Sequence, residues 1–284
     1  MISREFANTL RESDPKLLVK NYSKYTSDVF MESGVPVVIA ARNEENDLPA
    51  TLISLAGSTR EIWPVVVENG STDRTFEVAT KMGAHVLRCS QPFKMAALQT
   101  GICELDERSR LGQPVLFTDA DSMVGPTWAE ALHDAVKGSE LKCASGRSIV
   151  ACGPSELADF LGTLAMDGQD IKRILFNEHP VGRGDDSAIN FAGDKQAVLT
   201  YLSIRPNLFI GEDDMIFDLL EKRHDAKFAK VLGNRAAVLS RGDRFKKPSD
   251  RILCVFPGWK KHLVGLYSDY DSIDPAIYGD KISK

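Results

Sequence analysis

Two aspartates at the end of a short apolar run are the residues of this chain that point most directly to chemistry. Asp119 and Asp121 follow the run VLF at 115–117 and are separated only by Ala120. Residues at positions i and i+2 of a strand point to the same side, so the two carboxylates are expected to lie together. Neighbouring carboxylates repel each other unless a proton or a cation lies between them. The pair therefore indicates a site for a hard divalent cation such as Mg²⁺, which typically binds together with a phosphate, and a pair of turn aspartates that cap the next helix is the alternative.

Polar clusters also follow two earlier apolar runs. The run at 35–40 leads into the residues ARNEE, and the run at 64–67 leads into ENGSTD. The carboxyl ends of parallel strands meet at one edge of a sheet, where open α/β sheets bind their ligands. The three clusters therefore predict a pocket at this edge, in which Arg42 suits a phosphate group.

The second cluster, ENGSTD, suits both a turn and a ligand. The Asn69-Gly70 pair favours a sharp turn, and Ser71 or Thr72 is expected to cap the helix that follows. Glu68 and Asn69 also carry the oxygen and amide groups that hydrogen-bond the edge of a nucleobase.

Strand-like and helical segments alternate through the first half of the chain. Strands are expected at 35–40, 64–67, 84–88 and 115–118, and helices at 47–58, 72–82 and 95–105. Such alternation with short connections predicts an α/β fold with a doubly wound, mostly parallel sheet. The second half is more mixed, with strands expected at 143–151, 187–191 and within 226–240, and helices at 156–176 and 213–223. We expect one continuous domain after an N-terminal helical arm at 1–34.

The bulk composition is that of an ordinary globular protein. The chain has 284 residues and a formal net charge of −5, which disfavours a nucleic-acid-binding surface overall. No apolar stretch reaches the roughly 18 residues that span a bilayer, and the N-terminal residues lack the apolar core of a secretory signal. Five cysteines without a C-x-x-C pair predict free thiols and a cytoplasmic location.

Four segments, in this order and spacing, resemble the GT-A-fold glycosyltransferases of family two: VPVVIAARNEENDLPATLISL, VVVENGSTDRT, PFKMAALQTG and VLFTDADSMVGPTW. The resemblance covers residues 35–130 well and continues in patches to Phe245. It implies a Rossmann-like GT-A fold in a single domain. The implied divisions are a GT-A domain at 35–245, with a nucleotide-sugar half at 35–125 and an acceptor half at 126–245, and a C-terminal extension at 246–284.

The resemblance also implies a nucleotide-diphosphate-sugar donor, with UDP as the expected nucleotide, and a Mn²⁺ or Mg²⁺ cofactor at Asp119 and Asp121. The residues that match donor-binding positions of the family are Ala41, Arg42, Glu44, Glu68, Asn69, Lys94, Asp119, Ala120, Asp121 and Arg241. Glu68 stands where the family often has Asp and is expected to contact the base. Asn69 replaces a second common Asp, which leaves the choice of base open.

An acceptor hydroxyl must lose its proton as it attacks the sugar, so a general base is required. Glu212, Asp213 and Asp214 precede an apolar helical run, where acids also complement the helix dipole. The family has an E-D pair at this place, so the resemblance implies that Asp213 is the base and that Glu212 positions the acceptor, with Asp214 in reserve. It also implies inversion of the anomeric centre by direct displacement.

Two basic segments follow these acids. The residues SRGDRF at 240–245 resemble a family segment with one position changed, so Arg241 or Arg244 is expected either at the diphosphate or in a solvated loop. The segment 251–267 interleaves apolar and basic residues, which fits peripheral contact with an anionic membrane or a packed last helix. The resemblance makes His262 a candidate metal ligand.

Three functions are compatible with these residues. Metal-dependent sugar transfer to an acceptor hydroxyl is the leading hypothesis. Nucleotidyl transfer uses a similar sheet, but its usual glycine-rich loop is missing from ARNE after the first strand. A non-catalytic nucleotide-sugar-binding module is the third, and it is disfavoured by the intact acids Asp119, Asp121, Glu212 and Asp213. The sequence does not decide whether the acceptor is a glycan, a lipid, a small metabolite, a protein or a modified nucleobase.

Overall fold

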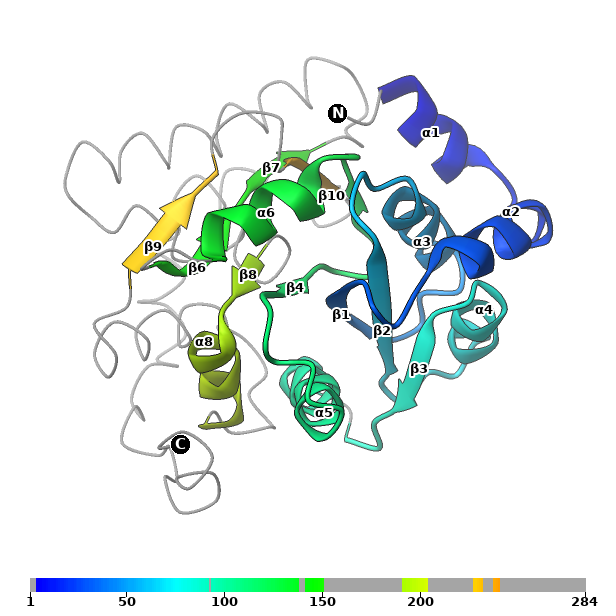
Figure 1. The fold of residues 1–284 in the computed structure, drawn as a ribbon. Helices are drawn as coiled ribbons and strands as arrows, with labels where there is room; N and C mark the ends of the chain where they lie inside the picture. The colour runs from blue at the N-terminus through cyan, green and yellow to red at the C-terminus, as the bar shows by residue number, and fades with distance from the viewer. Residues whose placement is uncertain are drawn as a thin grey trace, which may run out of the picture.

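A seven-stranded sheet forms the centre of the molecule (Figure 1). The computed structural model describes residues 4–91, 93–137, 141–150, 191–203, 227–231 and 237–240. The strands of the sheet are, in spatial order, β3 (His85–Arg88), β2 (Ile62–Glu68), β1 (Val35–Ala41), β4 (Val115–Phe117), β8 (Phe191–Gly193), β6 (Leu141–Ser145) and β9 (Lys227–Lys230). Within this sheet β8 runs antiparallel to both of its neighbours, and the other pairs are parallel. The expected mostly parallel sheet is confirmed.

Helices cover both faces of this sheet, as a doubly wound fold requires (Figure 1). The helices are α1 (Arg4–Glu12), α2 (Pro15–Val29), α3 (Leu48–Ala56), α4 (Thr75–Lys81), α5 (Lys94–Glu107), α6 (Trp128–Val136), α8 (Lys195–Thr200) and the 3₁₀ helix η1 (Tyr201–Ser203). Side chains of α1 to α4 and α6 share one apolar cluster, whereas those of α5, α8 and η1 belong to a second cluster. Each side of the sheet therefore has its own core layer.

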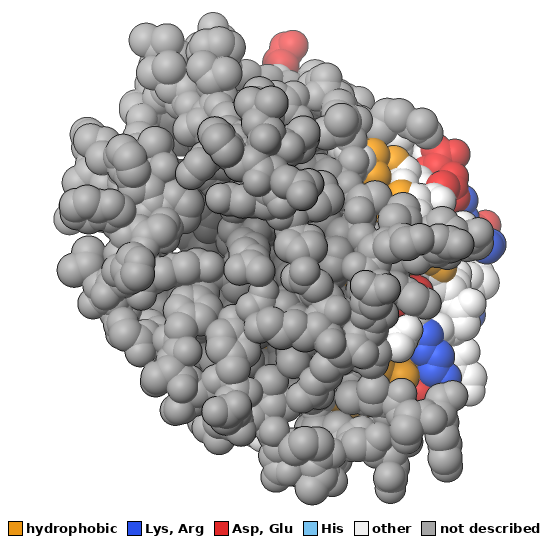
Figure 2. Space-filling model, turned by 90° about the vertical axis from the view of Figure 1, so that its left-hand side faces the viewer, with side chains coloured by type: hydrophobic (Ala, Val, Ile, Leu, Met, Phe, Trp, Pro, Cys, Tyr) orange, Lys and Arg blue, Asp and Glu red, His pale blue; other side chains and the backbone are white. Residues whose placement is uncertain are grey.

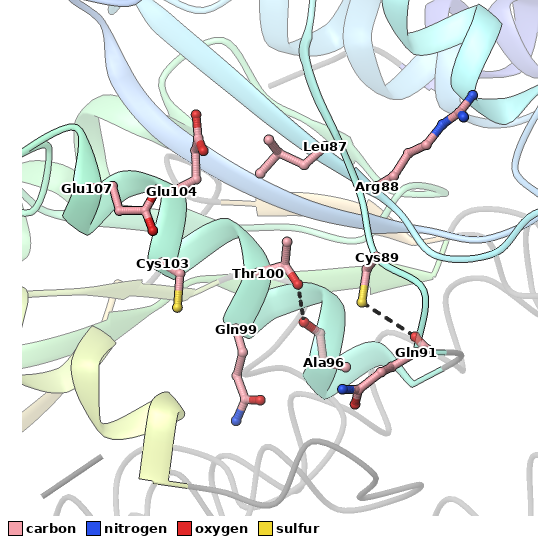
Figure 3. Close-up of a pocket in the computed structure, with 10 residues that line it drawn as sticks. All are labelled: Leu87, Arg88, Cys89, Gln91, Ala96, Gln99, Thr100, Cys103, Glu104 and Glu107. Carbon is pink, nitrogen blue, oxygen red and sulfur yellow. Dashed lines mark hydrogen bonds between the residues drawn. The ribbon is translucent and has the colours of Figure 1, made fainter. Parts of the chain in front are cut away.

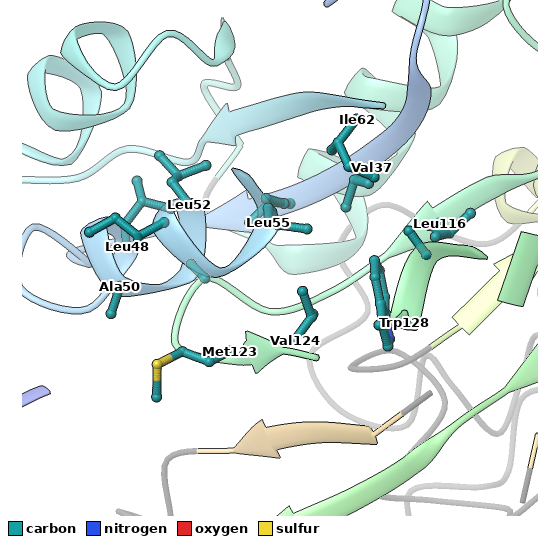
Figure 4. Packing of buried hydrophobic residues seen from close by; sticks show 14 of the residues in the cluster. Val37, Leu48, Ala50, Leu52, Leu55, Ile62, Leu116, Met123, Val124 and Trp128 are labelled. Atoms are coloured by element: carbon teal, nitrogen blue, oxygen red, sulfur yellow. The ribbon is translucent and has the colours of Figure 1, made fainter. Parts of the chain in front are cut away.

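The position of β1 between two helical layers explains why its sequence is an unbroken apolar run. Val37 faces the α3 side of the sheet and Val38 faces the α5 side, and both are fully buried. On the α3 side, Val37 packs in one cluster with Leu52 and Leu55 of α3 and with Trp128 of α6 (Figure 4). A strand between two helical layers needs apolar side chains on both faces.

A smaller sheet of three strands lies beside the main one (Figure 1). It consists of β5 (Met123–Val124), β10 (Ala237–Ser240) and β7 (Arg147–Val150). The strand expected at 143–151 is thus divided between β6 and β7, which belong to different sheets. The helices expected at 156–176 and 213–223 lie outside the described residues.

Most boundaries in the first half agree with expectation, and Gly83 ends α4 as a left-handed residue with φ of +79°. The arm at 1–34 contains α1 and α2, which pack on α3. The sequence analysis missed α6 and α8. No helix among the described residues is long and apolar enough to cross a bilayer. Figure 2 shows acidic, basic and apolar side chains interspersed among the described residues on one face.

The position of α5 depends on a glycine that lets the helix approach the sheet closely. A Cβ placed on Gly101 would lie 2.7 Å from Cγ1 of Val38 and 3.2 Å from Cγ2 of Val67. Val38 and Val67 are fully buried, and β-branched side chains have few rotamers to which they can retreat. Gly101 therefore allows α5 to pack closely on β1 and β2. This packing also fixes the position of Lys94 in the first turn of the helix.

We expect Gly101→Ala to destabilise the protein although alanine is the better helix former. Overpacking should cost about 1–3 kcal/mol, which outweighs a helix-propensity gain of about 1 kcal/mol. Urea denaturation measures this as a lower free energy of unfolding. Gly112→Ala is the matched control, because nothing lies within 4 Å of a Cβ at that position. Equal or greater stability of Gly101→Ala would contradict the packing argument.

Candidate functional site

The polar clusters predicted at the strand ends do meet at one edge of the main sheet. Ala41, the last residue of β1, pairs with Glu68, the last residue of β2. The amide of Asn69 donates a hydrogen bond of 2.9 Å to the carbonyl of Ala41, so the two strands stay together as they end. On the other side of β1, the parallel strand β4 leads directly into Asp119 and Asp121.

The loops after β1 and β2 are fastened to each other by hydrogen bonds around Asn43. The amide of Asn43 donates to Oγ of Ser71 at 3.1 Å. Its side-chain Oδ1 accepts from the amide of Thr72 at 2.8 Å and from the Thr72 hydroxyl at 3.3 Å. Asn43 has a φ of +57°, a left-handed conformation that asparagine tolerates better than most residues. This backbone turn lets Asn43 present both its amide and its side chain to the second loop.

The same two loops are joined again one residue further along. The amide of Glu44 donates to Oγ1 of Thr75 at 2.8 Å, and the amide of Glu45 donates to Oδ2 of Asp73 at 3.0 Å. Nε of Arg74 lies 2.9 Å from Oε2 of Glu45. Three consecutive amides of the first loop, those of residues 43, 44 and 45, therefore each donate to a side chain in the second loop or at the start of α4.

Asp73 accepts hydrogen bonds from both loops, and its pKa is lower than usual. Partial burial raises the pKa of this carboxyl, but hydrogen bonds from Thr75 and from the amide of Glu45 stabilise the charged form and outweigh that effect. Asp73 is thus a carboxylate whose charge holds the junction of the two loops.

Glu68 and Asn69 are both buried at this junction, with exposed fractions of 8% and 3%. One oxygen of the Glu68 carboxylate accepts a hydrogen bond from the amide of Ser71, within its own loop. The Oδ1 atom of Asn69 is buried and has no hydrogen-bond partner among the described residues. A buried polar atom without a partner costs stability, so an amide oxygen of this kind is suited to receive a donor from a ligand.

Lys94 and Asp119 bring the third cluster into contact with α5. Nζ of Lys94 lies 2.8 Å from Oδ1 of Asp119. Lys94 is the first residue of α5, and Phe93 at the N-cap provides no side-chain cap. Amides of an uncapped first turn and the helix dipole both favour an anion at this position.

The loop that carries Asp119 and Asp121 is anchored to α3. The carbonyl of Ala120 accepts a hydrogen bond of 2.7 Å from the hydroxyl of Thr51, and Ala120 is buried. The hydroxyl of Ser122 lies 3.4 Å from Oδ1 of Asp121. Among the described residues, no group of three or more His, Cys, Asp or Glu side chains is arranged to hold a metal ion. Within the described ranges, the carboxylates of this loop are those of Asp119 and Asp121, and Lys94 contacts the first of them.

One expectation about this site was wrong, and several of its residues were not foreseen. Ser71 and Thr72 do not cap α4, because the helix begins only at Thr75 and both residues bind Asn43 instead. The sequence analysis gave no role to Asn43, Thr51 or Asp73. Asn43 and Asp73 had a local signal, since asparagine tolerates a left-handed turn and aspartate often binds the backbone amide two residues further on.

The structure describes Ala41, Arg42, Glu44, Glu68, Asn69, Lys94, Asp119, Ala120 and Asp121 at the strand-end edge. Arg42 is exposed and Glu44 is half-buried. The expected acceptor-side residues, the expected diphosphate arginines and the candidate metal-binding histidine lie outside the described residues: Glu212, Asp213, Asp214, Arg241, Arg244 and His262. Their roles stay predictions.

A cavity of about 410 Å³ lies on the flank of α5, between this helix and the end of β3 (Figure 3). It extends from Cys89 and Gln91 along α5 to Glu107. Its polar atoms are in part satisfied by local bonds, such as the 2.8 Å hydrogen bond from the hydroxyl of Thr100 to the carbonyl of Ala96. None of the sequence-predicted site residues that the structure describes lines it.

Residues 37–192, more than half of the chain, match the family described as Glycosyl transferase family 2. The chain therefore belongs to glycosyltransferase family 2. The 4,4'-diaponeurosporenoate glycosyltransferase of Staphylococcus haemolyticus (strain JCSC1435) is 44% identical over 52 residues, which make up 18% of this chain. That match covers 14% of the relative, so it concerns only a small part of that protein.

Solved structures of glucosyl-3-phosphoglycerate synthase from Mycobacterium tuberculosis share the fold. The complex with Mn²⁺ and UDP-glucose superposes with a TM-score of 0.54 at 16% identity, over 86% of this chain and 82% of the other. The complex with Mn²⁺, UDP and glucosyl-3-phosphoglycerate gives 0.53 at 16% identity, over 84% and 80%. At this identity the likeness establishes the fold, and the expected GT-A architecture of a glycosyltransferase is confirmed.

We expect Asn43→Ala to lower the free energy of unfolding by about 1–2 kcal/mol, measured by urea denaturation. The substitution removes the acceptor for Thr72 and leaves a Cβ-bearing residue at a φ of +57°. Asn43→Gly tolerates this φ and should lose less stability than Asn43→Ala. Asn43→Asp keeps both the acceptor and the tolerance for the turn, so it should stay near the wild-type value. Equal losses of stability in the Ala and Asp variants would show that the hydrogen bond from Thr72 to the side chain of Asn43 does not stabilise the fold.

The charge on Asp73 gives the loop junction a defined pH dependence. Because the folded-state pKa lies below the ordinary value of 3.8, this carboxylate contributes stability above that pH and loses it as the pH falls through the folded-state pKa. We expect Asp73→Asn to be less stable than wild type by about 1 kcal/mol at pH 6. The difference should shrink as the pH is lowered towards 3, in denaturation curves recorded at each pH. A difference that is constant with pH would contradict this role of the charge.

Proposed function

We propose that this family-2 glycosyltransferase transfers a sugar from a nucleotide diphosphate donor, a UDP-sugar, to an acceptor hydroxyl with inversion. The observation that carries the proposal is the convergence of three strand-end loops on one sheet edge, where Asp119 meets Lys94 and Asn69 offers an unpaired oxygen. These groups match the parts of such a donor: an amide for the base, a cationic group for the diphosphate and carboxylates for a cation.

Within this proposal the base lies against Asn69. An amide Oδ1 accepts a hydrogen bond from an N–H group, as on the edge of uracil, and the Glu68 carboxylate is already engaged by the amide of Ser71. The fastened loops after β1 and β2 supply a rigid wall for this contact, because residues 43 to 45 cannot move without breaking bonds to residues 71 to 75. Arg42 and Glu44 extend along the nucleoside from the same wall.

The donor atoms at Asp119 and Asp121 fit Mn²⁺ or Mg²⁺, because hard divalent cations prefer carboxylate oxygens and are often completed by substrate phosphates. Glucosyl-3-phosphoglycerate synthase, which shares the fold, has been solved with Mn²⁺ and UDP-glucose together. When bound, the cation supplies stabilisation for the negative charge of the diphosphate leaving group. Lys94 and the first turn of α5 add positive charge from the protein side.

On the acceptor side, Asp213 removes the proton of the attacking hydroxyl and Glu212 orients the acceptor. Attack from the face opposite the leaving diphosphate inverts the anomeric centre. Arg241 adds a further cationic contact for the diphosphate. What supports these three roles is the resemblance of the Glu212-Asp213 pair and of the segment at 240–245 to family segments, which lie beyond the matched residues 37–192.

We expect Asp121→Asn to lower kcat for sugar transfer by about a hundredfold or more, because the variant loses a charged ligand for the cation. The donor is first chosen by a thermal-shift screen of UDP-, GDP- and CDP-sugars with Mn²⁺, and turnover is then followed as nucleoside diphosphate released in the presence of acceptor pools. Asp28→Asn, which alters an exposed carboxylate on α2, is the matched control and should keep wild-type activity.

Two outcomes would replace the proposal with its alternatives. Release of pyrophosphate from a nucleoside triphosphate would favour nucleotidyl transfer. Tight binding of a nucleotide sugar without hydrolysis or transfer would favour a non-catalytic binding module. Wild-type turnover by Asp121→Asn, or in excess chelator, would remove the metal from the mechanism.

A further inference from the structure

The contact between Lys94 and Asp119 has a consequence for how a metal ion enters the site. The Lys94 ammonium and the Asp119 carboxylate are 2.8 Å apart, and their side chains are 32% and 17% exposed. The charge of Asp119 is therefore already balanced by the protein. Lys94 also lies in the first turn of α5, where the helix dipole adds positive character. A divalent cation approaching Asp119 meets positive charge as well as a carboxylate.

The described side chains offer few other metal ligands that would offset this repulsion. Asp119 and Asp121 are the two carboxylates of the loop, and no set of three His, Cys, Asp or Glu side chains in the described ranges is arranged to hold an ion. A diphosphate changes both the number of ligands and the repulsion from Lys94. Its oxygens are ligands for the cation, and its negative charge attracts the ammonium away from Asp119.

We propose that Lys94 competes with the divalent cation for Asp119, and that a nucleoside diphosphate relieves this competition by drawing the ammonium to its phosphates. The proposal rests on the proposed function, because it takes the diphosphate to lie beside Lys94. Metal and nucleotide then bind as a coupled pair. By linkage, UDP raises the affinity for Mn²⁺ by the same factor by which Mn²⁺ raises the affinity for UDP.

Binding of Mn²⁺ alone tests the competition without nucleotide and without activity. Free Mn²⁺ is counted by electron paramagnetic resonance in titrations of the wild-type protein and of Lys94→Met. The variant is expected to bind Mn²⁺ about tenfold more tightly, because a competing charge close to the ion has been removed. Lys94→Arg keeps the cation and should behave as wild type. Lys81→Met, which removes an exposed lysine at the end of α4, should also match wild type.

A double variant assigns the effect to Asp119. The tighter Mn²⁺ binding of Lys94→Met should disappear in Lys94→Met/Asp119→Asn. Lys94→Gln is a second neutral variant, in case Lys94→Met does not fold. Affinity for Mn²⁺ alone that is unchanged or weaker in the folded neutral variant would overturn the proposal, as would tighter binding that survives in the double variant.

Repeating the titrations with UDP measures the coupling. In wild type, UDP should raise the Mn²⁺ affinity strongly, and in Lys94→Met this factor should fall by about tenfold or more, since the competition that UDP relieves is gone. An undiminished factor would overturn the proposal. Failure of wild type to bind UDP in any of these titrations would instead overturn the proposed function, while the Mn²⁺-only titrations still decide whether Lys94 competes for Asp119.

Discussion

The parallel pairing of β1 with β2 on one side and β4 on the other is the constraint on which the rest of the structure depends. It brings the ends of three strands, and the loops that follow them, to one edge of the sheet. Loops at that edge do not need to be long to meet, because the strands have already placed their first residues side by side. The pairing of Ala41 with Glu68 is sufficient to bring the two loops within hydrogen-bonding distance.

Each loop is then held by a different element, which gives the site its shape. The first two loops hold each other through the amides of residues 43 to 45, and the third is anchored to α3 by the hydroxyl of Thr51. Lys94 reaches the same edge because Gly101 lets α5 lie close to β1 and β2. Charged and polar groups that are held by a rigid scaffold need little rearrangement when a ligand arrives. The two core layers thus hold in place the loops and the helix from which this edge is built.

The sheet and the strand-end edge were predictable from sequence because they depend on local patterns. Apolar runs, short connections and polar residues after each run led to β1 through β4 and to Asp119 and Asp121. The hydrogen bonds between the loops were not predictable, because the partners of Asn43 are nearly thirty residues away in the chain. The amino-acid sequence of neither loop specifies these partners. The burial of Asn69 without a partner in the described part of the chain is likewise a property of three-dimensional packing, which the polar residues around it in the sequence did not indicate.

The place of β8 in the sheet has a consequence for the order of folding. Phe117 of β4 pairs with Phe191 of β8, so β4 keeps an unpaired edge until a much later part of the chain has been synthesised. The contacts of β1 with β2 and of β2 with β3 are far more local and form early in such a chain. During translation, the half that carries Asp119 therefore passes through a stage with an open strand edge, where pairing with another chain competes with folding. Arrival of β8 ends that exposure and joins the two halves of the sheet.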